Sequence, residues 1–339
     1  MGSIIKSVVP GRICLVGEHC DYAQGRSVAL PLQHEQITAY AERRDDRIVS
    51  LVSALEDRAF RLSFSLDDIP TSEEHPLRYA SAVVQAMYSK HPDIQGMNIT
   101  MDSTLPIKKG LASSAAVSVS IAEIFNHFFS PRLSPRDLAA IAYEAEHDIL
   151  GIGCGRMDQL AVAYKSLIHL DYQHQQSAVV TLLPSSPDPM HILVGIPLTT
   201  SRAIHVMLSA ANSAYFHPRN EHDFVFKRAL DHRIPQEVVL PFVNAVQKGD
   251  KELAGKLLRH NQQIYNECFV PICESFRAPL LNTFFEIAQR NGSLGEKWTG
   301  AGGNGAFICL TDSSSARDAL QDALREESSL DIQFLHATL

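Results

Sequence analysis

The 339-residue chain contains no long apolar run and no excess of positive charge. No stretch approaches the ~18 uncharged apolar residues that a membrane-spanning helix needs. Residues 1–10 lack the apolar segment and the cleavage site of a secretory signal peptide. The formal net charge of −8 and the isoelectric point near 6.0 give no electrostatic basis for binding nucleic acid or an anionic membrane. We therefore expect a cytoplasmic protein whose partners are neither nucleic acids nor membranes.

Cysteine and histidine patterns that would indicate a metal site are also missing. The six cysteines are scattered without a CxxC pair, and the fifteen histidines include no HExxH spacing. In a chain of this size we expect the cysteines to remain thiols in a reducing cytosol. The hydrophobic content of 45% and charged content of 20% are typical of a globular protein with a substantial core.

The order of apolar patterns predicts a mixed, segregated α+β fold. Strands are expected at residues 4–9, 37–41, 47–52, 97–101, 191–196, 306–310 and 332–335. Helices are expected at residues 76–88, after Ser114, from Ser134 with Pro135 and Asp137 in its first turn, over most of 197–291, and after 310. Residues 183–189 hold three prolines and mark the best candidate boundary between two domains, residues 1–185 and 186–339.

A polar group directly follows the first β-like run. The apolar residues 13–16 end at Gly17, and hydrogen-bonding side chains stand on both sides of that run. They are Arg12, Glu18, His19 and Asp21. A strand that ends in glycine and releases such side chains is typical of a ligand-binding loop, and neighbouring carboxylate and imidazole groups suit a polyhydroxylated ligand. The alternative is a solvated turn.

A second segment, residues 105–116, places small residues before an amphipathic helix. Gly110 lets the backbone approach a ligand closely, and the start of the helix offers free N–H groups to an anion. Ser113 and Ser114 could cap this helix, or one hydroxyl could turn to a phosphate-bound Mg²⁺.

A third segment, residues 297–305, contains four glycines in its last six residues. Gly300, Gly302 and Gly305 match GxGxxG in form, but they precede a strand rather than a helix. A dinucleotide-binding fold therefore does not fit, and a glycine-rich loop over an active site fits better than a plain β-turn.

Two carboxylates lie between these segments. Glu146 follows Ala142 by four residues, which places it at the edge of the buried face of a helix. Asp158 follows Gly151, Gly153 and Gly155 in a compact turn, from which a carboxylate can reach a pocket as a base or charge stabiliser.

Together these segments resemble the GHMP kinases, the superfamily of galactokinase, homoserine kinase, mevalonate kinase and phosphomevalonate kinase. The likeness covers most of the chain, and the motifs occur in the family's order. The opening motif of the galactokinase branch, PGRxNLIGEHTDYxxG, is met by residues 10–25, with Cys14 and Cys20 in place of Asn and Thr. The CGIMDQ motif is met by residues 154–159, with Arg156 in place of Ile. Mevalonate kinases lack the Glu-His-x-Asp-Tyr block, so its presence points to a sugar.

The resemblance implies a role for each matching residue. Asp158 accepts the proton of the attacking hydroxyl or stabilises its charge, and Arg12 keeps Asp158 ionised and neutralises charge as the phosphoryl group moves. Ser114 and Glu146 hold Mg²⁺. The sugar hydroxyls are bound by Glu18, His19, Asp21 and the backbone of Gly155. The ATP phosphates are wrapped by Lys109, Gly110, Leu111, Ala112, Ser113, Ser114 and Ala115.

The implied protein is an ATP- and Mg²⁺-dependent kinase for the anomeric (C1) hydroxyl of a small sugar. Its implied fold has an N-terminal domain like ribosomal protein S5 domain 2 and a ferredoxin-like C-terminal domain. Galactose is the first candidate substrate, followed by a uronic acid, a pentose, a heptose or a cyclitol such as inositol. An isoprenoid precursor fits the polar motif less well. A non-catalytic sugar and ATP sensor is the alternative from another class.

Some positions depart from the family pattern. The phosphate loop of galactokinases reads PxGxGLSSSAA, whereas this chain has Lys108 and Lys109 before Gly110, and Ala112 replaces the first Ser. The lysines could contact phosphates or lie exposed. The family's later pocket-lining Tyr has no secure match, and the chain is shorter than most galactokinases. These departures leave the identity of the sugar open.

Overall fold

The computed structural model describes residues 4–55, 58–70, 75–173, 178–198, 203–328 and 330–339. The chain divides into two compact units, neither of which is continuous in sequence. The first unit comprises Met1–Arg12, Pro31–Lys108 and Ala112–Lys165. The second comprises Ile13–Leu30, Lys109–Leu111 and Ser166–Leu339.

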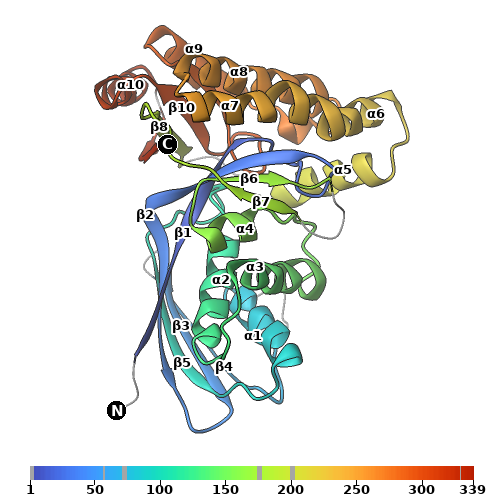
Figure 1. Cartoon of the computed structure of the whole chain (residues 1–339), viewed down its shortest axis with the longest axis vertical. Helices are drawn as coiled ribbons and strands as arrows, with labels where there is room; N and C mark the ends of the chain where they lie inside the picture. The colour runs from blue at the N-terminus through green and yellow to red at the C-terminus, as the bar shows by residue number, and fades with distance from the viewer. Residues whose placement is uncertain (1–3, 56–57, 71–74, 174–177, 199–202, 329) are drawn as a thin grey trace. The chain divides into compact units, whose positions relative to one another are not determined.

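The first unit is a layer of helices on one face of a sheet (Figure 1). Its sheet contains β3 (Ile48–Leu55), which pairs antiparallel with β4 (Arg58–Ser65) and parallel with β5 (Met97–Ser103). β5 pairs in turn with residues 37–43 of β2 (Arg26–Arg43), and β1 (Ile5–Val16) also pairs with β2. The covering helices are α1 (Arg78–Lys90), α2 (Ser113–Asn126), α3 (Pro135–Glu144), the π-helical η1 (Ala145–Ile149) and α4 (Met157–Tyr164).

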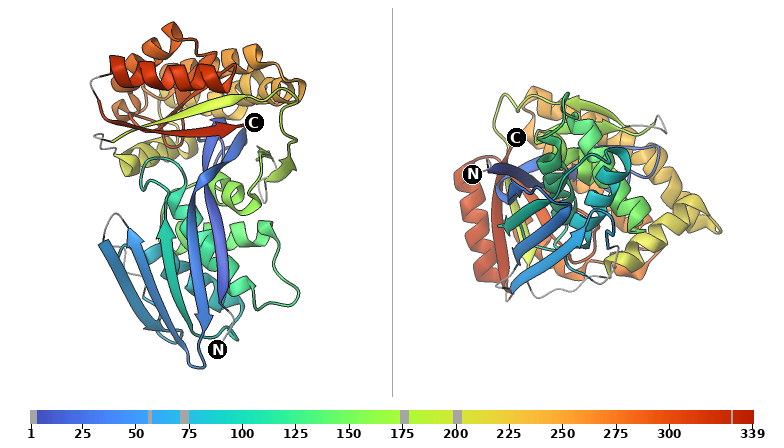
Figure 2. Two further views of the ribbon diagram at one scale, coloured as in Figure 1. Left: turned by 90° about the vertical axis from the view of Figure 1, so that its left-hand side faces the viewer. Right: turned by 90° about the horizontal axis from the view of Figure 1, so that it is seen from below.

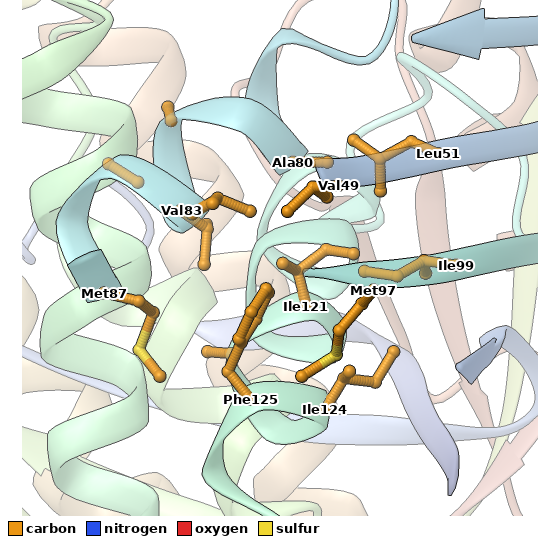
Figure 3. Packing of buried hydrophobic residues seen from close by; sticks show 14 of the residues in the cluster. Val49, Leu51, Ala80, Val83, Met87, Met97, Ile99, Ile121, Ile124 and Phe125 are labelled. Carbon is orange, nitrogen blue, oxygen red and sulfur yellow. The ribbon is translucent and has the colours of Figure 1, made fainter. Parts of the chain in front are cut away.

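The core of the first unit forms where this sheet meets its helices. Along β5 the side chains of Met97, Ile99 and Met101 are buried and the residues between them are exposed, so the strand presents one apolar face. Against that face pack apolar side chains of α1 and α2, including Val83, Ile121, Ile124 and Phe125 (Figure 3). This packing fixes α2, whose first turn carries the predicted phosphate-binding serines.

The second unit contains a four-stranded antiparallel sheet in the order β11-β8-β10-β9. The strands are β8 (His191–Pro197), β9 (Gly295–Trp298), β10 (Phe307–Thr311) and β11 (Ile332–Thr338). One face of the sheet is covered by α8 (Lys251–Cys268), α9 (Pro279–Arg290) and α10 (Ser314–Glu327), as Figure 2 shows. With the helices between β8 and β9 counted together, the chain follows the β-α-β-β-α-β order of a ferredoxin-like domain.

Further elements complete the second unit. Residues 26–29 of β2 pair with β6 (Ile168–Asp171), and β6 pairs with β7 (Val179–Leu182). Between β8 and α8 lie α5 (Ile204–Phe216), α6 (Glu221–Arg228), the π-helical η2 (Ala229–Val239) and α7 (Leu240–Lys248), and the short η3 (Glu274–Phe276) follows α8. Across the described helices, none is long and apolar enough to cross a bilayer. All six cysteines are thiols rather than disulfides.

The α+β prediction is confirmed, and each predicted strand and helix overlaps an observed element. The start of α3 has the expected capping box, in which Ser134 accepts from the Asp137 N–H and the Asp137 side chain accepts from the Ser134 N–H. The short strands β4, β6, β7 and β9 are absent from the prediction. β9 is the instructive omission, because its sequence Gly-Glu-Lys-Trp looks solvent-exposed although all four residues are buried. The compact units also divide the chain at different points from the predicted boundary at residues 185 and 186.

The centre of the second sheet has a position that only glycine fits. Gly195 of β8 lies opposite Phe307 of β10, and a Cβ at Gly195 would lie 2.1 Å from the Phe307 ring. That ring is fully buried and stacks on Phe284 with ring centroids 5.3 Å apart, so it has little room to move.

We predict that Gly195→Ala destabilises the protein by about 1–3 kcal/mol through overpacking. The measurement is thermal or urea unfolding followed by circular dichroism. Adding Phe307→Leu to the same chain should restore part of the loss, because the smaller side chain makes room for the methyl group. An unchanged unfolding transition in Gly195→Ala would contradict this account of the sheet.

Candidate active site

The 17–25 loop, which joins β1 to β2, carries most of the residues predicted to bind a sugar. Gly17 has φ +88°, and a Cβ there would lie 2.2 Å from the Arg26 carbonyl oxygen, so the two arms of the loop approach closely only because residue 17 is glycine. His19 has φ +63°, a left-handed conformation that costs a non-glycine residue energy and is found preferentially at functional sites. The loop conformation therefore depends on glycine at position 17 and on a left-handed residue at position 19.

Glu18 turns into the interior of the second unit. Its carboxylate is fully buried and forms an ion pair with Lys297 of β9, which is also fully buried. The second carboxylate oxygen accepts a hydrogen bond of 2.5 Å from the Tyr265 hydroxyl of α8. Both oxygens of Glu18 thus have protein partners, and its prediction as a sugar ligand remains a prediction.

The backbone of the 17–25 loop is bound by the same helix. The Gly17 N–H donates to Asn261 Oδ1 at 3.1 Å, and the Glu18 N–H donates to the Tyr265 hydroxyl oxygen at 2.8 Å. Burial raises the pKa of Tyr265 well above its usual value, with the Glu18 charge adding to the effect, so the hydroxyl stays protonated and can donate. Helix α8 therefore fixes the position of the loop.

His19 and Asp21 differ in exposure. The His19 ring is 5% exposed, its two nitrogens lie 2.9 Å from the Tyr22 hydroxyl and 3.2 Å from the Ala301 carbonyl oxygen, and it packs edge-on against Phe269 and Phe276. Asp21 is half-buried. Of the three predicted side chains in this loop, Asp21 is therefore the most accessible to a ligand.

Several residues that hold this loop escape sequence reasoning. Lys297 stands in the third segment, but that segment draws attention through its glycines, and a lone lysine is normally exposed. Tyr265 and Asn261 lie four residues apart on one face of α8, which gives only the weak signal of polar groups among buried positions. Tyr215 of α5 donates to Asp231 at 2.7 Å and accepts from the Gln24 N–H at 3.2 Å, so it fixes the far end of the loop.

The glycine-rich loop of residues 299–305 leads into β10, as expected for a loop that precedes a strand. Gly300 has φ +79°, and a Cβ there would lie 2.5 Å from the Gly110 carbonyl oxygen. The two glycine-containing segments therefore touch through backbone atoms. Lys109, one residue earlier, donates from Nζ to the carbonyl oxygens of Pro197 and Leu198 at 3.1 and 3.2 Å. The Lys109 ammonium group is thus hydrogen-bonded to the last residue of β8 and to the residue after it.

The conformation at the start of α2 bears on whether Ser113 or Ser114 caps the helix or is available to a phosphate-bound Mg²⁺. The N-cap is Ala112 with φ +61°, and Ser113 and Ser114 are the first two helical residues, with no side chain capping the helix. The capping role is therefore not the one observed. The first N–H groups of α2 remain without a side-chain acceptor from the cap position, as a phosphate-binding helix start requires. The remaining predicted residues of this loop, Leu111, Ala112 and Ala115, are buried.

Glu146 lies in the π-helical turn η1 and is 2% exposed, more deeply buried than the predicted helix edge. Burial raises its pKa to about 7, opposed by hydrogen bonds from Gln159 and Ser114. Gln159 Nε2 donates to Glu146 Oε1 at 3.0 Å, while the Gln159 Oε1 atom is buried without a hydrogen-bond partner among the described residues. A carboxylate short of compensating charge beside a serine hydroxyl is a suitable donor set for Mg²⁺.

The described residues contain no group of three or more His, Cys, Asp or Glu side chains that could hold a metal by themselves. Mg²⁺ in phosphoryl-transfer enzymes is commonly bound by one or two protein ligands together with substrate phosphates. Ser114 and Glu146 fit such a partial site.

Asp158 and Arg12 form an ion pair within the first unit. The Arg12 side chain is 3% exposed, and its Nε and Nη2 atoms lie 2.9 and 2.5 Å from Asp158 Oδ1. The Asp158 side chain is 31% exposed, so part of it is open to solvent. The charge of Asp158 also contributes to the raised pKa of Glu146, which places the two carboxylates in one electrostatic environment.

The turn before Asp158 presents the remaining predicted residue, Gly155, half-buried. Arg156, which replaces the family's Ile, places its guanidinium 4.8 Å from the centroid of the Tyr143 ring. Tyr143 stacks in turn on His147 at 4.8 Å. In the first unit the structure therefore brings together Arg12, Ser114, Glu146 and Asp158, and in the second it brings together the 17–25 loop, residues 109–111 and the glycine-rich loop.

The raised pKa of Glu146 predicts a pH-dependent stability. The pKa of Glu146 is about 7 in the folded protein and 4.5 ordinarily. The contribution of its protonated form to the free energy of unfolding is therefore complete below pH 4.5 and is lost as the pH rises through 7. The difference of about 2.5 pH units between the two pKa values limits the resulting change in the free energy of unfolding to roughly 3 kcal/mol. We predict that Glu146→Gln raises the melting temperature relative to wild type more at about pH 8 than at about pH 5.5, without added Mg²⁺ or nucleotide. The same difference at both pH values would contradict the prediction.

Comparison with known proteins identifies the family. The family models for the GHMP kinases N terminal domain and GHMP kinases C terminal match residues 78–166 and 242–329. A galactokinase of Pyrococcus furiosus is 26% identical over 334 residues, which covers 94% of this chain and 92% of that protein. The crystal structure of Lactococcus lactis galactokinase complexed with galactose superposes with a TM-score of 0.82 at 20% identity, covering 99% of this chain and 94% of that one. Methanococcus jannaschii mevalonate kinase gives 0.74 at 18% identity, covering 100% and 99%.

The two likenesses to solved structures concern the fold, and the family models and the galactokinase relative concern the sequence. All agree with the motifs and with the α+β architecture described above. This chain is therefore a member of the GHMP kinases, phosphotransferases with a hydroxyl acceptor, and it has their two-domain fold.

Proposed function

We propose that this protein is an ATP-dependent sugar kinase that phosphorylates the anomeric (C1) hydroxyl of a small sugar, with galactose or a galactose-like sugar as substrate. The observation that carries the proposal is the ion pair between buried Arg12 and partly exposed Asp158. Phosphoryl transfer needs a group that orients the attacking hydroxyl and positive charge near the transferring group, and this pair supplies both.

In the proposed mechanism Asp158 accepts a hydrogen bond from the attacking hydroxyl. Both guanidinium contacts go to Oδ1, so the other oxygen is the one we assign to the substrate. As the hydroxyl oxygen bonds to the γ-phosphorus of ATP, the bond from that phosphorus to the β,γ-bridging oxygen breaks and ADP leaves, and the Asp158 carboxylate takes up the hydroxyl proton. Arg12 holds the carboxylate in one orientation and offsets the negative charge that accumulates during transfer.

Residues 109–115 are the proposed phosphate-binding loop for ATP. The uncapped start of α2 offers N–H groups and the positive end of a helix dipole to the phosphates. Ser114 and Glu146 would hold Mg²⁺, which neutralises phosphate charge when bound. Because Lys109 donates to two backbone carbonyls, we assign it to the support of this loop rather than to direct contact with phosphate.

The proposed sugar site contains the 17–25 loop, and the backbone of Gly155 is assigned to sugar binding on the family resemblance alone. Three features support a sugar: the polar Glu18-His19-x-Asp21 sequence, the Pyrococcus furiosus relative named galactokinase, and the Lactococcus lactis galactokinase structure, which contains galactose. Arg156 is a reason to include acidic sugars among the candidates, since this cation stands where galactokinases have an apolar residue. We also propose that the enzyme works in the cytoplasm.

The first prediction from this proposal concerns the substrate. ADP release with Mg-ATP is measured across D-galactose, other hexoses, uronic acids, pentoses, heptoses and inositol. We expect turnover with galactose or a close relative, and NMR of the product should place the phosphate on C1. A phosphate on another hydroxyl would contradict the assigned chemistry. Sugar binding without ADP release would favour the sensor, and inositol turnover would favour a cyclitol kinase.

The second prediction concerns Asp158. We expect Asp158→Asn to lower the rate by about 10²–10⁴-fold, because the amide cannot accept the proton. The variant leaves the buried Arg12 without its charged partner, so its melting temperature should be measured beside its activity. Asp148→Asn is the matched control, because Asp148 is exposed and pairs with His147 in the same unit. Near-wild-type turnover of Asp158→Asn would remove Asp158 from the mechanism.

A further inference from the structure

We infer that Gln159 belongs to the proposed Mg²⁺ site, where its amide nitrogen positions the Glu146 carboxylate and its carbonyl oxygen accepts a hydrogen bond from a water bound to the metal. Gln159 is thus a positioning residue rather than a metal ligand. The inference rests on the proposed kinase function, because it requires that Ser114 and Glu146 hold Mg²⁺ together with ATP.

The three residues of this site lie on three elements of the first unit. Ser114 is in the first turn of α2, Glu146 in the π-helical turn η1, and Gln159 in the first turn of α4. Helix α2 packs against both η1 and α4. Glu146 and Gln159 are 2% and 1% exposed, so neither side chain can turn to bulk water for its hydrogen bonds.

The neighbours of the Gln159 amide determine which way it faces. Nε2 donates to Glu146 Oε1 at 3.0 Å and to Cys154 Sγ at 3.9 Å, so both of its N–H groups have acceptors. In the reverse orientation the amide oxygen would lie against a carboxylate oxygen, which puts two acceptors together. The bond to Oε1 holds the Glu146 carboxylate in place, and we assign its other oxygen to the metal.

The carbonyl oxygen of the same amide is not explained by a purely structural role. Gln159 Oε1 is buried and has no hydrogen-bond partner among the described residues. An unpaired buried acceptor costs free energy, and a residue that served only as a donor to Glu146 would gain nothing from it. Because the two polar atoms of an amide share one carbon, this acceptor lies next to the Glu146 carboxylate.

A hydrated Mg²⁺ supplies the donor that this oxygen lacks. With one hydroxyl and one carboxylate from the protein, Mg²⁺ keeps several water ligands beside the phosphate oxygens, because it gives up water reluctantly. The charge of the cation polarises such a water and makes it a strong donor. Groups that hydrogen-bond to metal ligands orient them, and their loss typically lowers metal affinity by about 10–100-fold.

Helix α4 links this role to the reacting group. Asp158 and Gln159 are consecutive, and consecutive side chains of a helix point ~100° apart. Asp158 therefore pairs with Arg12, while Gln159 reaches Glu146 in the interior. One helical turn thus carries both the proposed proton acceptor and the group that positions the metal carboxylate.

The experiment compares the wild type with Gln159→Met and Gln159→Glu. Met has nearly the length of Gln and removes both the donor and the acceptor, whereas Glu removes the donor and adds a negative oxygen. The melting temperature is measured against Mg²⁺ concentration with a fixed concentration of a non-hydrolysable ATP analogue, which gives an apparent Mg²⁺ affinity. The KM for the sugar that the wild type turns over is measured beside it.

We expect the two variants to depart from wild type in opposite directions. Gln159→Met should weaken the apparent Mg²⁺ affinity by about 10–100-fold, because Glu146 is no longer held and the metal-bound water loses its acceptor. Gln159→Glu should strengthen this affinity by about tenfold, because a second anion beside the metal carboxylate attracts the cation. The sugar KM should stay within about twofold in both variants.

Two further variants serve as controls. Gln159→Asn keeps the amide but shortens the side chain, so it should weaken the Mg²⁺ affinity and provides the test if Gln159→Met does not fold. Asn126→Leu is the matched control, because Asn126 is a buried amide of α2 that is hydrogen-bonded to the backbone of Leu133. It should lower the melting temperature equally at every Mg²⁺ concentration.

Wild-type Mg²⁺ affinity in Gln159→Met and Gln159→Asn would overturn the inference, because Gln159 would then contribute only to packing. Weakened affinity in Gln159→Glu would overturn the role assigned to the carbonyl oxygen, because a carboxylate there would lie beyond the influence of the metal. A wild type that shows no Mg²⁺-dependent stabilisation with the nucleotide would contradict both the inference and the proposed function. A wild type that shows it but phosphorylates no sugar would contradict the proposed function alone.

Discussion

A buried carboxylate needs hydrogen-bond donors or a cation to replace water, and three acidic residues of this fold meet that requirement in different ways. Glu18 is paired with the Lys297 ammonium through one oxygen and accepts from the Tyr265 hydroxyl through the other. Asp158 receives one buried guanidinium on one oxygen and keeps part of its surface exposed. Glu146 receives only neutral donors and has a pKa raised to about 7. The three carboxylates therefore differ in how far neighbouring donors compensate their charge.

Left-handed backbone conformations are concentrated in the 17–25 loop and just before α2. Among the described non-glycine residues, positive φ occurs at His19, Lys108, Ala112 and Lys165. Three of these four lie in the 17–25 loop or at the approach to α2, where each costs energy that ordinary packing elsewhere must offset. The left-handed Ala112 turns the chain directly into the first turn of α2, and the left-handed His19 turns the chain out of the core.

Local features can be predicted from the motifs, whereas contacts between residues distant in the sequence cannot. The capping box at Ser134, the alternation along β5 and the helix after the phosphate loop follow from neighbouring residues, so a single sequence reveals them. The Arg12–Asp158 pair was expected only through the family resemblance, because 146 residues separate its members. The sequence does not predict the burial of Lys297, because a lysine is normally solvated and its charged partner Glu18 is distant in the sequence. The π-helical turn at Glu146 likewise moved that residue from a helix edge into the interior.

The assignment of residues Ile13–Leu30 to the second unit has a consequence for synthesis on the ribosome. Glu18 of this segment is translated 279 residues before its partner Lys297. The Glu18 carboxylate therefore cannot pair with the Lys297 ammonium until residue 297 has been translated. Residues 13–30 belong to the second unit, most of which follows residue 165, so their contacts within that unit form after those of the first unit can form. A truncated product ending before β9 would thus carry every residue of the opening motif and still lack the partner that gives the motif its shape.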